Sequence, residues 1–183
     1  MVFLDVGVLG LCVGLLAGGR FANLASTTIR LYWLAFAAIG LQVLAFPPEL
    51  LPWSTPTPVA KVLWLVSYAL LITLLWVNRG LTGAPIIGVG LLCNLVAILA
   101  NGGLMPVRPA ALVATGHDYH VHNNSIQLGH PHLAFLVDRW GAPHWLPLAN
   151  VYSIGDLVIG LGTIVAIVAA MRREPATTEL ATA

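Results

Sequence analysis

Long apolar stretches separated by short polar or proline-rich breaks dominate the chain. Five of them approach the length of about 20 residues that a transmembrane helix needs. They are interrupted by paired glycines at 18–19 and 102–103 and by paired prolines at 47–48, residues that end helices. The pattern predicts an all-α polytopic membrane protein with five transmembrane helices, at residues 2–18, 29–47, 60–78, 84–102 and 150–171.

The first stretch resembles a signal peptide in length. However, no Lys or Arg precedes its apolar run, which carries Asp5 instead, so we expect a retained helix. Residues 1–173 are expected to form a single membrane domain. The tail at 174–183 is small and polar and is expected to be flexible.

Residues 103–149 form a segment too long for an unstructured loop in a compact protein. It contains two apolar patches, 109–115 and 132–137, which are too short to span and are predicted to form interfacial or re-entrant helices. Trp140 and Trp145 suit the aromatic belt of a membrane interface. We therefore expect this segment to fold as a cap over the outer end of the helices.

Composition supports a membrane protein and excludes one other class. The chain is 58% hydrophobic and 8% charged, with a mean hydropathy of +0.89, whereas soluble domains carry about 25% charged residues. A net charge of +1 provides no basic field for nucleic acid. Cys12 and Cys93 lie inside apolar runs, as small hydrophobic residues do, rather than in a disulfide or metal pattern.

The placement of Lys and Arg predicts the orientation in the membrane. With five spans, one side carries Arg20, Arg30, Arg79, Arg172 and Arg173, and the other carries Lys61, Arg108 and Arg139. The side richer in positive charge is expected to be cytoplasmic. This places the N-terminus outside and the C-terminus in the cytoplasm.

Polar residues within the apolar segments are the first candidate site, because such residues usually face a bundle interior or a cavity. They are Asp5, Gln42, Asn94, Asn101 and Asp156. Asn94 and Asn101 share one helix face about 10 Å apart, and Ser153 lies on the same stripe as Asp156. The predicted ligand-binding layer comprises Asp156, Asn101, Asn94, Ser153 and Asp5.

Asp156 is the most informative member of this layer. A helix starting at residue 150 would place it about two turns in, where a carboxyl must be protonated, paired with a base such as Arg108 or Arg139, or bound to a ligand. The alternative for the amides is that they only form hydrogen bonds between helices.

A histidine cluster in the cap segment is the second candidate site. The run HDYHVHNNSIQLGHPH holds His117, His120, His122, His130 and His132. Imidazoles beside a carboxylate suit zinc or copper, but no H-E-x-x-H or Cys-His frame is present. A solvated loop and a pH-sensitive latch are the alternatives. No P-loop, dinucleotide fingerprint or G-x-S-x-G is present, and no catalytic residue is assigned.

Three stretches carry a resemblance to a known family. ANGGLMPV at 100–107, LAFLVDRWG at 133–141 and VYSIGDLVIGLG at 151–162 resemble stretches of a family of small bacterial membrane proteins of unknown function. The resemblance implies a location in the bacterial plasma membrane and no particular activity. The histidine cluster is not part of that pattern.

Three classes of function remain open. The chain favours a non-catalytic accessory or assembly subunit, embedded in the lipid bilayer within a larger membrane complex or a homo-oligomer. The second class is a protein that binds or conducts a small ligand, an ion or a lipid headgroup at the layer around Asp156 and Asn101. The third is a metal-assisted membrane enzyme that uses the histidine segment.

Overall fold

The computed structural model describes residues 2–48, 50–115, 125–142 and 151–173, most of which are helical. The helices of this described part are α1 Val2–Leu16, α2 Phe21–Ala25, α3 Trp33–Ala45, α4 Thr57–Val77, α5 Ala84–Ala100, α6 Pro109–Thr115 and α7 Ile154–Arg172. Its strands are β1 Met105–Pro106, β2 Ser125–Ile126, β3 Trp140–Gly141 and β4 Val151–Tyr152.

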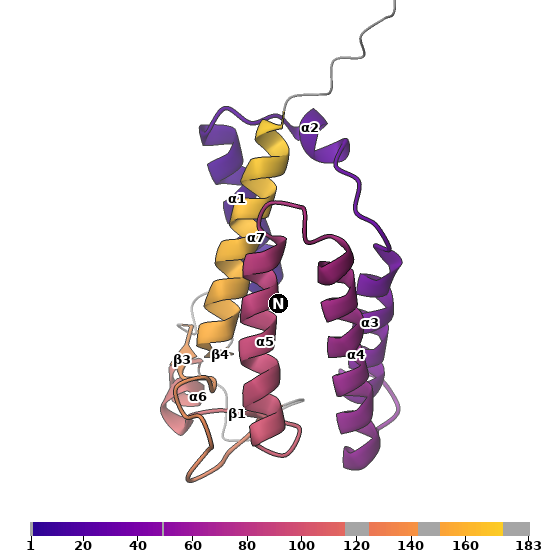
Figure 1. The fold of residues 1–183 in the computed structure, drawn as a ribbon. Helices are drawn as coiled ribbons and strands as arrows, with labels where there is room; N and C mark the ends of the chain where they lie inside the picture. The colour runs from indigo at the N-terminus through magenta and orange to yellow at the C-terminus, as the bar shows by residue number, and fades with distance from the viewer. Residues whose placement is uncertain (1, 49, 116–124, 143–150, 174–183) are drawn as a thin grey trace, which may run out of the picture.

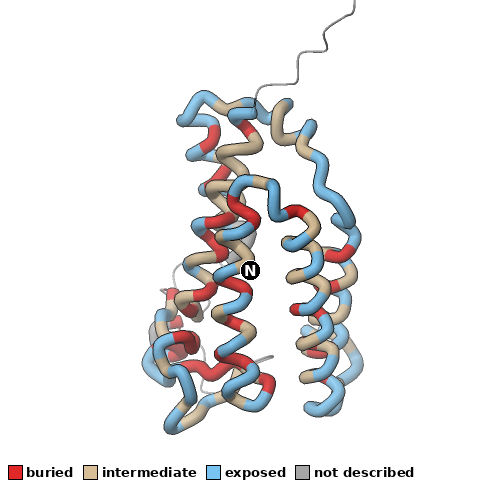
Figure 2. The backbone as a smooth tube through the Cα atoms, viewed as in Figure 1, coloured by how far each residue is buried: buried red, intermediate tan, exposed pale blue. Residues whose placement is uncertain are grey.

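The five longer helices run along one axis and alternate in direction (Figure 1). Helix α7 packs against both α5 and α1, and α3 packs against α4. The α3–α4 hairpin meets the other helices mainly where α4 contacts α5. Buried positions line the inward faces of α5 and α7, while much of α3 is exposed (Figure 2). The strands and α6 gather at the end where α7 begins (Figure 1).

Glycines allow α5 and α7 to approach each other closely. A Cβ added to Gly90 would lie 2.5 Å from the carbonyl oxygen of Gly155, and one on Gly162 would lie 2.7 Å from the amide nitrogen of Ile87. Small residues at such interfaces let helix backbones come into contact, as is common between membrane helices. The pair α5–α7 is therefore the tightly packed centre of the fold.

Two asparagines at helix ends hold distant backbone segments in the same way. Asn78 caps α4 and binds the backbone of Arg30, accepting from its N–H and donating to its carbonyl, both at 2.8 Å. Asn101 caps α5 and binds His132 likewise, at 2.8 and 2.9 Å. Each amide also donates to its own helix, four residues back. These contacts fix one connection at each end of the bundle.

The cap contains two small two-stranded sheets in addition to helix α6. Strand β1 pairs in parallel with β2, and residue 107 bridges in parallel to residue 138. Strand β3 then pairs antiparallel with β4. The prediction of an all-α fold is thus wrong in the cap. The expected helix at 109–115 forms as α6, but 132–137 is not helical, because His132 is held by Asn101 and Leu133 adopts a positive φ of 53°.

Each of the five predicted apolar segments is helical, although two begin later than expected. Helix α3 starts at Trp33 rather than at 29, because Leu31 has a φ of 55° beside the residue held by Asn78. Helix α7 starts at Ile154 rather than at 150, because residues 151–152 pair with β3. Within the described residues, α4 and α7 are long and apolar enough to cross a membrane, and three further apolar helices are shorter.

Candidate functional site

The three sequence stretches singled out above meet at the capped end of α5 and α7. The N–H of Asp138 donates to the carbonyl of Pro106 at 3.0 Å, and the N–H of Arg139 donates to the carbonyl of Tyr152 at 3.0 Å. The segment around residue 138 is therefore flanked by the segment from 100–107 on one side and by the start of 151–162 on the other. This arrangement brings the cap onto the first turn of α7.

Ser153 and Asp156 form a capping box at the start of α7. The hydroxyl of Ser153 accepts from the N–H of Asp156 at 3.0 Å, and the N–H of Ser153 donates to Asp156 Oδ2 at 2.9 Å. Asp156 thus lies in the first turn of its helix, and the expected position two turns in is wrong. The positive end of the helix dipole favours a carboxylate there.

Asn94 of α5 completes this arrangement. Its Nδ2 donates to Asp156 Oδ1 at 2.8 Å, and the hydroxyl of Ser153 lies 2.8 Å from Asn94 Oδ1. Ser153 is fully buried and Asn94 is 7% exposed. A buried polar group must be paired to avoid a large desolvation cost. These three side chains satisfy one another across the α5–α7 interface.

The described residues provide no basic partner for Asp156. Arg139 stacks over the ring of Trp140 at 5.0 Å. Arg108 is exposed, and its guanidinium lies 3.4 Å from the carbonyl of Ala134. The expected pairing of Asp156 with one of these arginines is therefore not observed. The amide of Asn94 and the hydroxyl of Ser153 are its side-chain partners instead.

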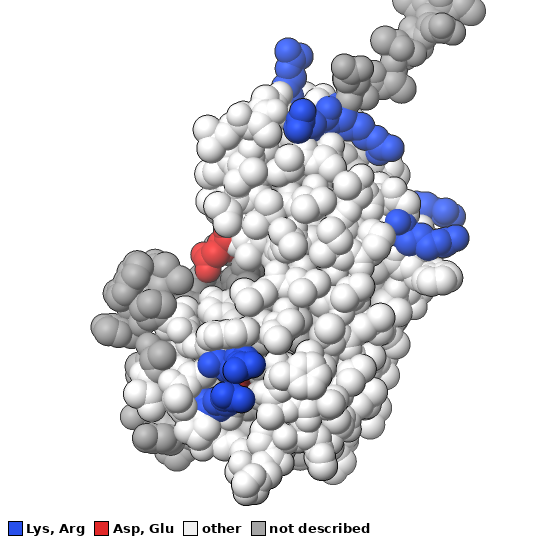
Figure 3. All heavy atoms as spheres, turned by 60° about the vertical axis from the view of Figure 1, so that its left-hand side comes forward, with Lys and Arg blue, Asp and Glu red and all other residues white. Residues whose placement is uncertain are grey.

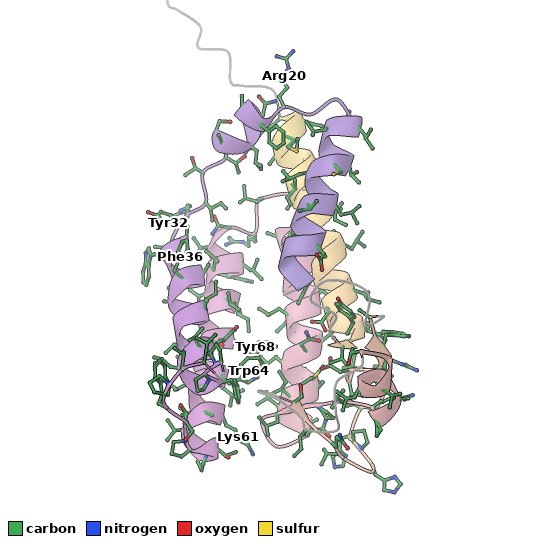
Figure 4. All side chains as sticks on the ribbon, turned by 180° about the vertical axis from the view of Figure 1, so that it is seen from behind. Arg20, Tyr32, Phe36, Lys61, Trp64 and Tyr68 are labelled. Carbon is green, nitrogen blue, oxygen red and sulfur yellow. The ribbon has the colours of Figure 1, made fainter. Side chains whose placement is uncertain are left out.

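A second carboxyl, Asp138 of the cap, lies close to this network. It is 7% exposed, and burial, followed by the negative charge of Asp156, raises its pKa to about 7. Tyr68 of α4 is also buried and lies within electrostatic range of both carboxyls. Figure 4 shows Tyr68 and Trp64 on α4, where they contribute to the core shared with α5, α7 and the cap.

A groove of about 420 Å³ opens between α1 and α7 beside Asp156. Asp5, Tyr152 and Asp156 border the groove, but nearly all of the surface that faces into it is apolar, with walls from Val6, Leu157, Gly160, Leu161 and Ile164. Burial, and then the charges of Asp5 and Asp156, raise the pKa of Tyr152. Its phenol therefore keeps its proton at neutral pH and remains a hydrogen-bond donor.

The predicted ligand-binding layer divides into three parts. Asn94, Ser153 and Asp156 are bonded to one another, and Asp5 shares the groove with Asp156. The side-chain amide of Asn101 forms hydrogen bonds with Ala97 and His132 and therefore holds the cap rather than the ligand-binding layer. Gln42 binds Ser67 within the α3–α4 hairpin at 3.1 Å.

Sequence reasoning left two members of this region out of the candidate site, although it placed Asp138 in the cap over the outer ends of the helices. Asp138 ends the apolar run LAFLV, a sign of a carboxyl drawn into an apolar setting. Tyr68 has no comparable signal, because aromatic residues are common in apolar helices. The capping box was visible as Ser-x-x-Asp ahead of an apolar run.

The candidate metal residues are placed only in part. His117, His120 and His122 lie outside the described residues. His130 and His132 are exposed, and His132 contributes its backbone to the contact with Asn101. Among the residues that the structure describes, no group of three or more His, Cys, Asp or Glu could hold a metal ion.

Comparison with known proteins gives a family for this chain but no activity. The chain belongs to DUF5317, a family of unknown function, which it matches over residues 26–168. It is similar to an uncharacterized protein of Thermotoga maritima, with 27% identity over 136 residues that cover 69% of this chain and 72% of that protein. No solved structure matches the chain. The expected membership of a family of unknown function is confirmed, and the matched region includes all three stretches that meet at the cap.

Proposed function

We propose that this protein is a multi-pass membrane protein that binds an organic ammonium compound with an apolar tail in the groove between α1 and α7. One observation carries the proposal. The groove has almost wholly apolar walls and is bordered by two carboxylates, Asp5 and Asp156, neither of which forms an ion pair within the described residues. A cation with an apolar body complements such a groove in charge and in polarity.

The membrane setting rests on the surfaces of the five apolar helices. Large apolar side chains point outward from them, with Phe36 69% exposed, Trp76 68% exposed and Leu161 56% exposed. Exposed apolar patches of this extent suit lipid rather than water. All five helices would cross the bilayer, and α3 and α5 are short enough that local thinning or tilted neighbours would accommodate them.

The proposed orientation follows the arginines. Lys and Arg side chains form one set at the end where α1 and α7 terminate and on the flank below it, and a second set in the cap, with an acidic patch on the surface between the two sets (Figure 3). The first group is the larger, so its end would face the cytoplasm of a bacterium. The cap, Asp5 and the groove would then lie in the outer half of the plasma membrane.

Asp156 is held in a fixed position for binding. Its carboxylate accepts from Asn94, the Ser153 N–H and the Ser153 hydroxyl. A carboxylate has about four acceptor positions, so one remains for an ammonium N–H. Asp5 is exposed and supplies a second negative charge, while the Tyr152 phenol can donate to a polar group of the ligand.

The size of the groove favours a small molecule over a protein segment. Ligand pockets commonly measure about 300–1,000 Å³, and this groove measures about 420 Å³. That volume suits an ammonium head and part of an alkyl chain. The accessory-subunit role would instead place a Lys or Arg of a partner protein beside the same carboxylates. The zinc- or copper-dependent enzyme has no supporting contact in the described part of the chain.

Three amphiphiles with the same tail test the proposal. Dodecylamine, dodecanol and tridecanoate share a dodecyl chain and differ only in their head groups. We expect the purified protein in nonionic detergent to bind dodecylamine at least tenfold more tightly than the other two, measured by calorimetry below their critical micelle concentrations. Asp5→Asn should weaken dodecylamine binding about tenfold, since one partner of a charge-assisted hydrogen bond is lost.

A groove-filling variant separates this site from general partitioning. Gly160→Leu places a side chain in the groove, where a Cβ would already lie 3.4 Å from Val6, and should abolish the preference for the amine. Equal binding of all three amphiphiles, or an unchanged affinity in Asp5→Asn, would refute the proposal. Purification with a stoichiometric partner whose removal leaves no amine binding would favour the accessory role instead.

A further inference from the structure

We infer that the cavity at the arginine-rich end of the bundle is a binding site for an anionic phospholipid of the membrane leaflet on that side. This basic-end cavity measures about 410 Å³ and is distinct from the groove at the other end. It lies between the segment that follows α2, the turn between α4 and α5, and the last turns of α7. The inference requires the membrane setting proposed above but not the ammonium ligand.

The walls of the cavity are fixed by asparagine side chains. Asn78 binds both backbone groups of Arg30 at 2.8 Å, which holds the segment containing Thr27 and Ile29 beside the α4–α5 turn. Asn23 Nδ2 donates to the carbonyl of Met171 at 2.9 Å, and so does the N–H of Arg20 at 2.8 Å. These bonds tie α2 to the end of α7, so the cavity is built by three fixed segments.

The charge at this end complements an anion. Arg173 lines the cavity, and Arg20, Arg30, Arg79 and Arg172 lie at the same end of the helices, as Figures 3 and 4 show for the group as a whole and for Arg20. The described acidic residues are Asp5, Asp138 and Asp156, and all of them belong to the groove or the cap at the opposite end. Within the described residues, these arginines therefore have no acidic neighbour.

The residues that line the cavity include both hydrogen-bond donors and apolar side chains, which match the headgroup and the acyl chains of a lipid. Thr82 and Arg173 offer a hydroxyl and a guanidinium donor, which suit the oxygens of a phosphate, whereas the Thr27 hydroxyl donates to the carbonyl of Asn23 at 3.3 Å. Leu24, Leu81 and Ile167 offer apolar surface for the first methylene groups of the acyl chains. Basic pockets between transmembrane helices on the cytoplasmic side bind anionic headgroups in this manner. A free phosphate ion would not use the apolar part.

Native mass spectrometry of the delipidated full-length protein tests the inference. We expect phosphatidylglycerol to bind at least fivefold more tightly than phosphatidylcholine with identical acyl chains. Arg173→Gln should reduce phosphatidylglycerol binding about fivefold. Arg108→Gln removes the same charge from the cap at the opposite end and should leave the binding unchanged.

A filled cavity distinguishes this site from a loose annulus of lipid around the arginines. Ala170 lines the cavity, and Ala170→Phe would fill the cavity without changing any charge. Thr82 also lines the cavity, from the exposed turn between α4 and α5, so Thr82→Phe would fill it from the other side. Both should lose the tightly bound lipid while keeping the helical circular dichroism and the melting temperature of the parent protein. The inference is overturned if the two lipids bind equally, if both arginine variants act alike, or if a folded filled variant still binds phosphatidylglycerol.

Discussion

The amide Nδ2 of Asn94 donates a 2.8 Å hydrogen bond to Asp156 Oδ1, joining the middle of α5 to the first turn of α7. The Ser153 hydroxyl lies 2.8 Å from both Asn94 Oδ1 and Asp156 Oδ2. Since this hydroxyl has a single proton, it donates to one of these oxygens at a time. The network therefore fixes Asp156 at the groove without neutralising its charge.

Breaking this network should cost stability. Asn94→Ala removes the bond to Asp156 and one partner of Ser153, and we expect a loss of about 1–2 kcal/mol in unfolding free energy. Ser153→Ala should cost a similar amount, because it also removes the helix cap. The double variant should cost less than the sum, as shared networks are not additive. Reversible unfolding in mixed micelles gives these values; strict additivity would show that the residues act independently. Thr73→Val, on an exposed turn of α4, is the control.

Close packing of α5 against α7 predicts contrasting effects for two neighbouring glycines. A Cβ on Gly90 would press on the backbone of Gly155, whereas a Cβ on Gly88 would meet nothing within 4 Å. We expect Gly90→Ala to lower stability by about 1–3 kcal/mol, as overpacking does. Gly88→Ala should be neutral or stabilising because it only improves helix propensity. Equal melting temperatures for the two variants would contradict the packing of α5 on α7.

Loss of the asparagine contact at one end of the bundle should increase hydrogen exchange at that end only. Asn101→Ala removes the acceptor of the His132 N–H and should raise hydrogen exchange at that amide and in the neighbouring cap. Asn78→Ala should do the same at the Arg30 amide and leave the cap protected. Hydrogen-exchange mass spectrometry resolves both segments. Loss of protection at both ends in either variant would show general unfolding instead.

Burial of Asp138 predicts that stability depends on pH. Its pKa is raised from 3.8 to about 7 in the folded protein, so the folded state binds the proton more tightly. Its contribution to stability is present below pH 4 and is lost as the pH rises to about 7, at about 1.4 kcal/mol for each pKa unit at most. Asp138→Asn should remove this component, so the variant should gain stability over the parent at pH 8 relative to pH 5. The same pH dependence in both proteins would contradict a buried, ionisable Asp138.

The five longer helices could be predicted from sequence because each is a long apolar run, and glycine, proline or asparagine follows the runs of α1, α3, α4 and α5. The first residues of α3 and α7 could not be predicted, because contacts with distant segments hold the preceding residues in a non-helical conformation. Asn78 holds Arg30 ahead of α3, and β3 pairs with Val151 and Tyr152 ahead of α7. Hydrophobic patterns contain no information about such distant partners.

Part of the candidate site could also be predicted from the sequence. Asp156 stood out as a carboxyl in an apolar segment, and its neighbours Asn94 and Ser153 were found through helical spacing. The two small sheets that bring Asp138 beside them depend on strand pairs of two residues each, too short for any periodicity to reveal. Asn101 was assigned to the layer by its spacing from Asn94, but its amide holds the cap.

Protection of a single cysteine in the groove is the measurement that tests the central claim most directly. Cys12 and Cys93 are first replaced by alanine. Leu161→Cys then reports on the groove and Leu99→Cys on the exposed side of α5, where the parent leucines are 56% and 54% exposed. We predict that dodecylamine slows maleimide labelling of Leu161→Cys at least fivefold, leaves Leu99→Cys unchanged, and loses its effect when Asp5→Asn is added. Equal protection of both cysteines, or protection that survives Asp5→Asn, would contradict an ammonium site between α1 and α7.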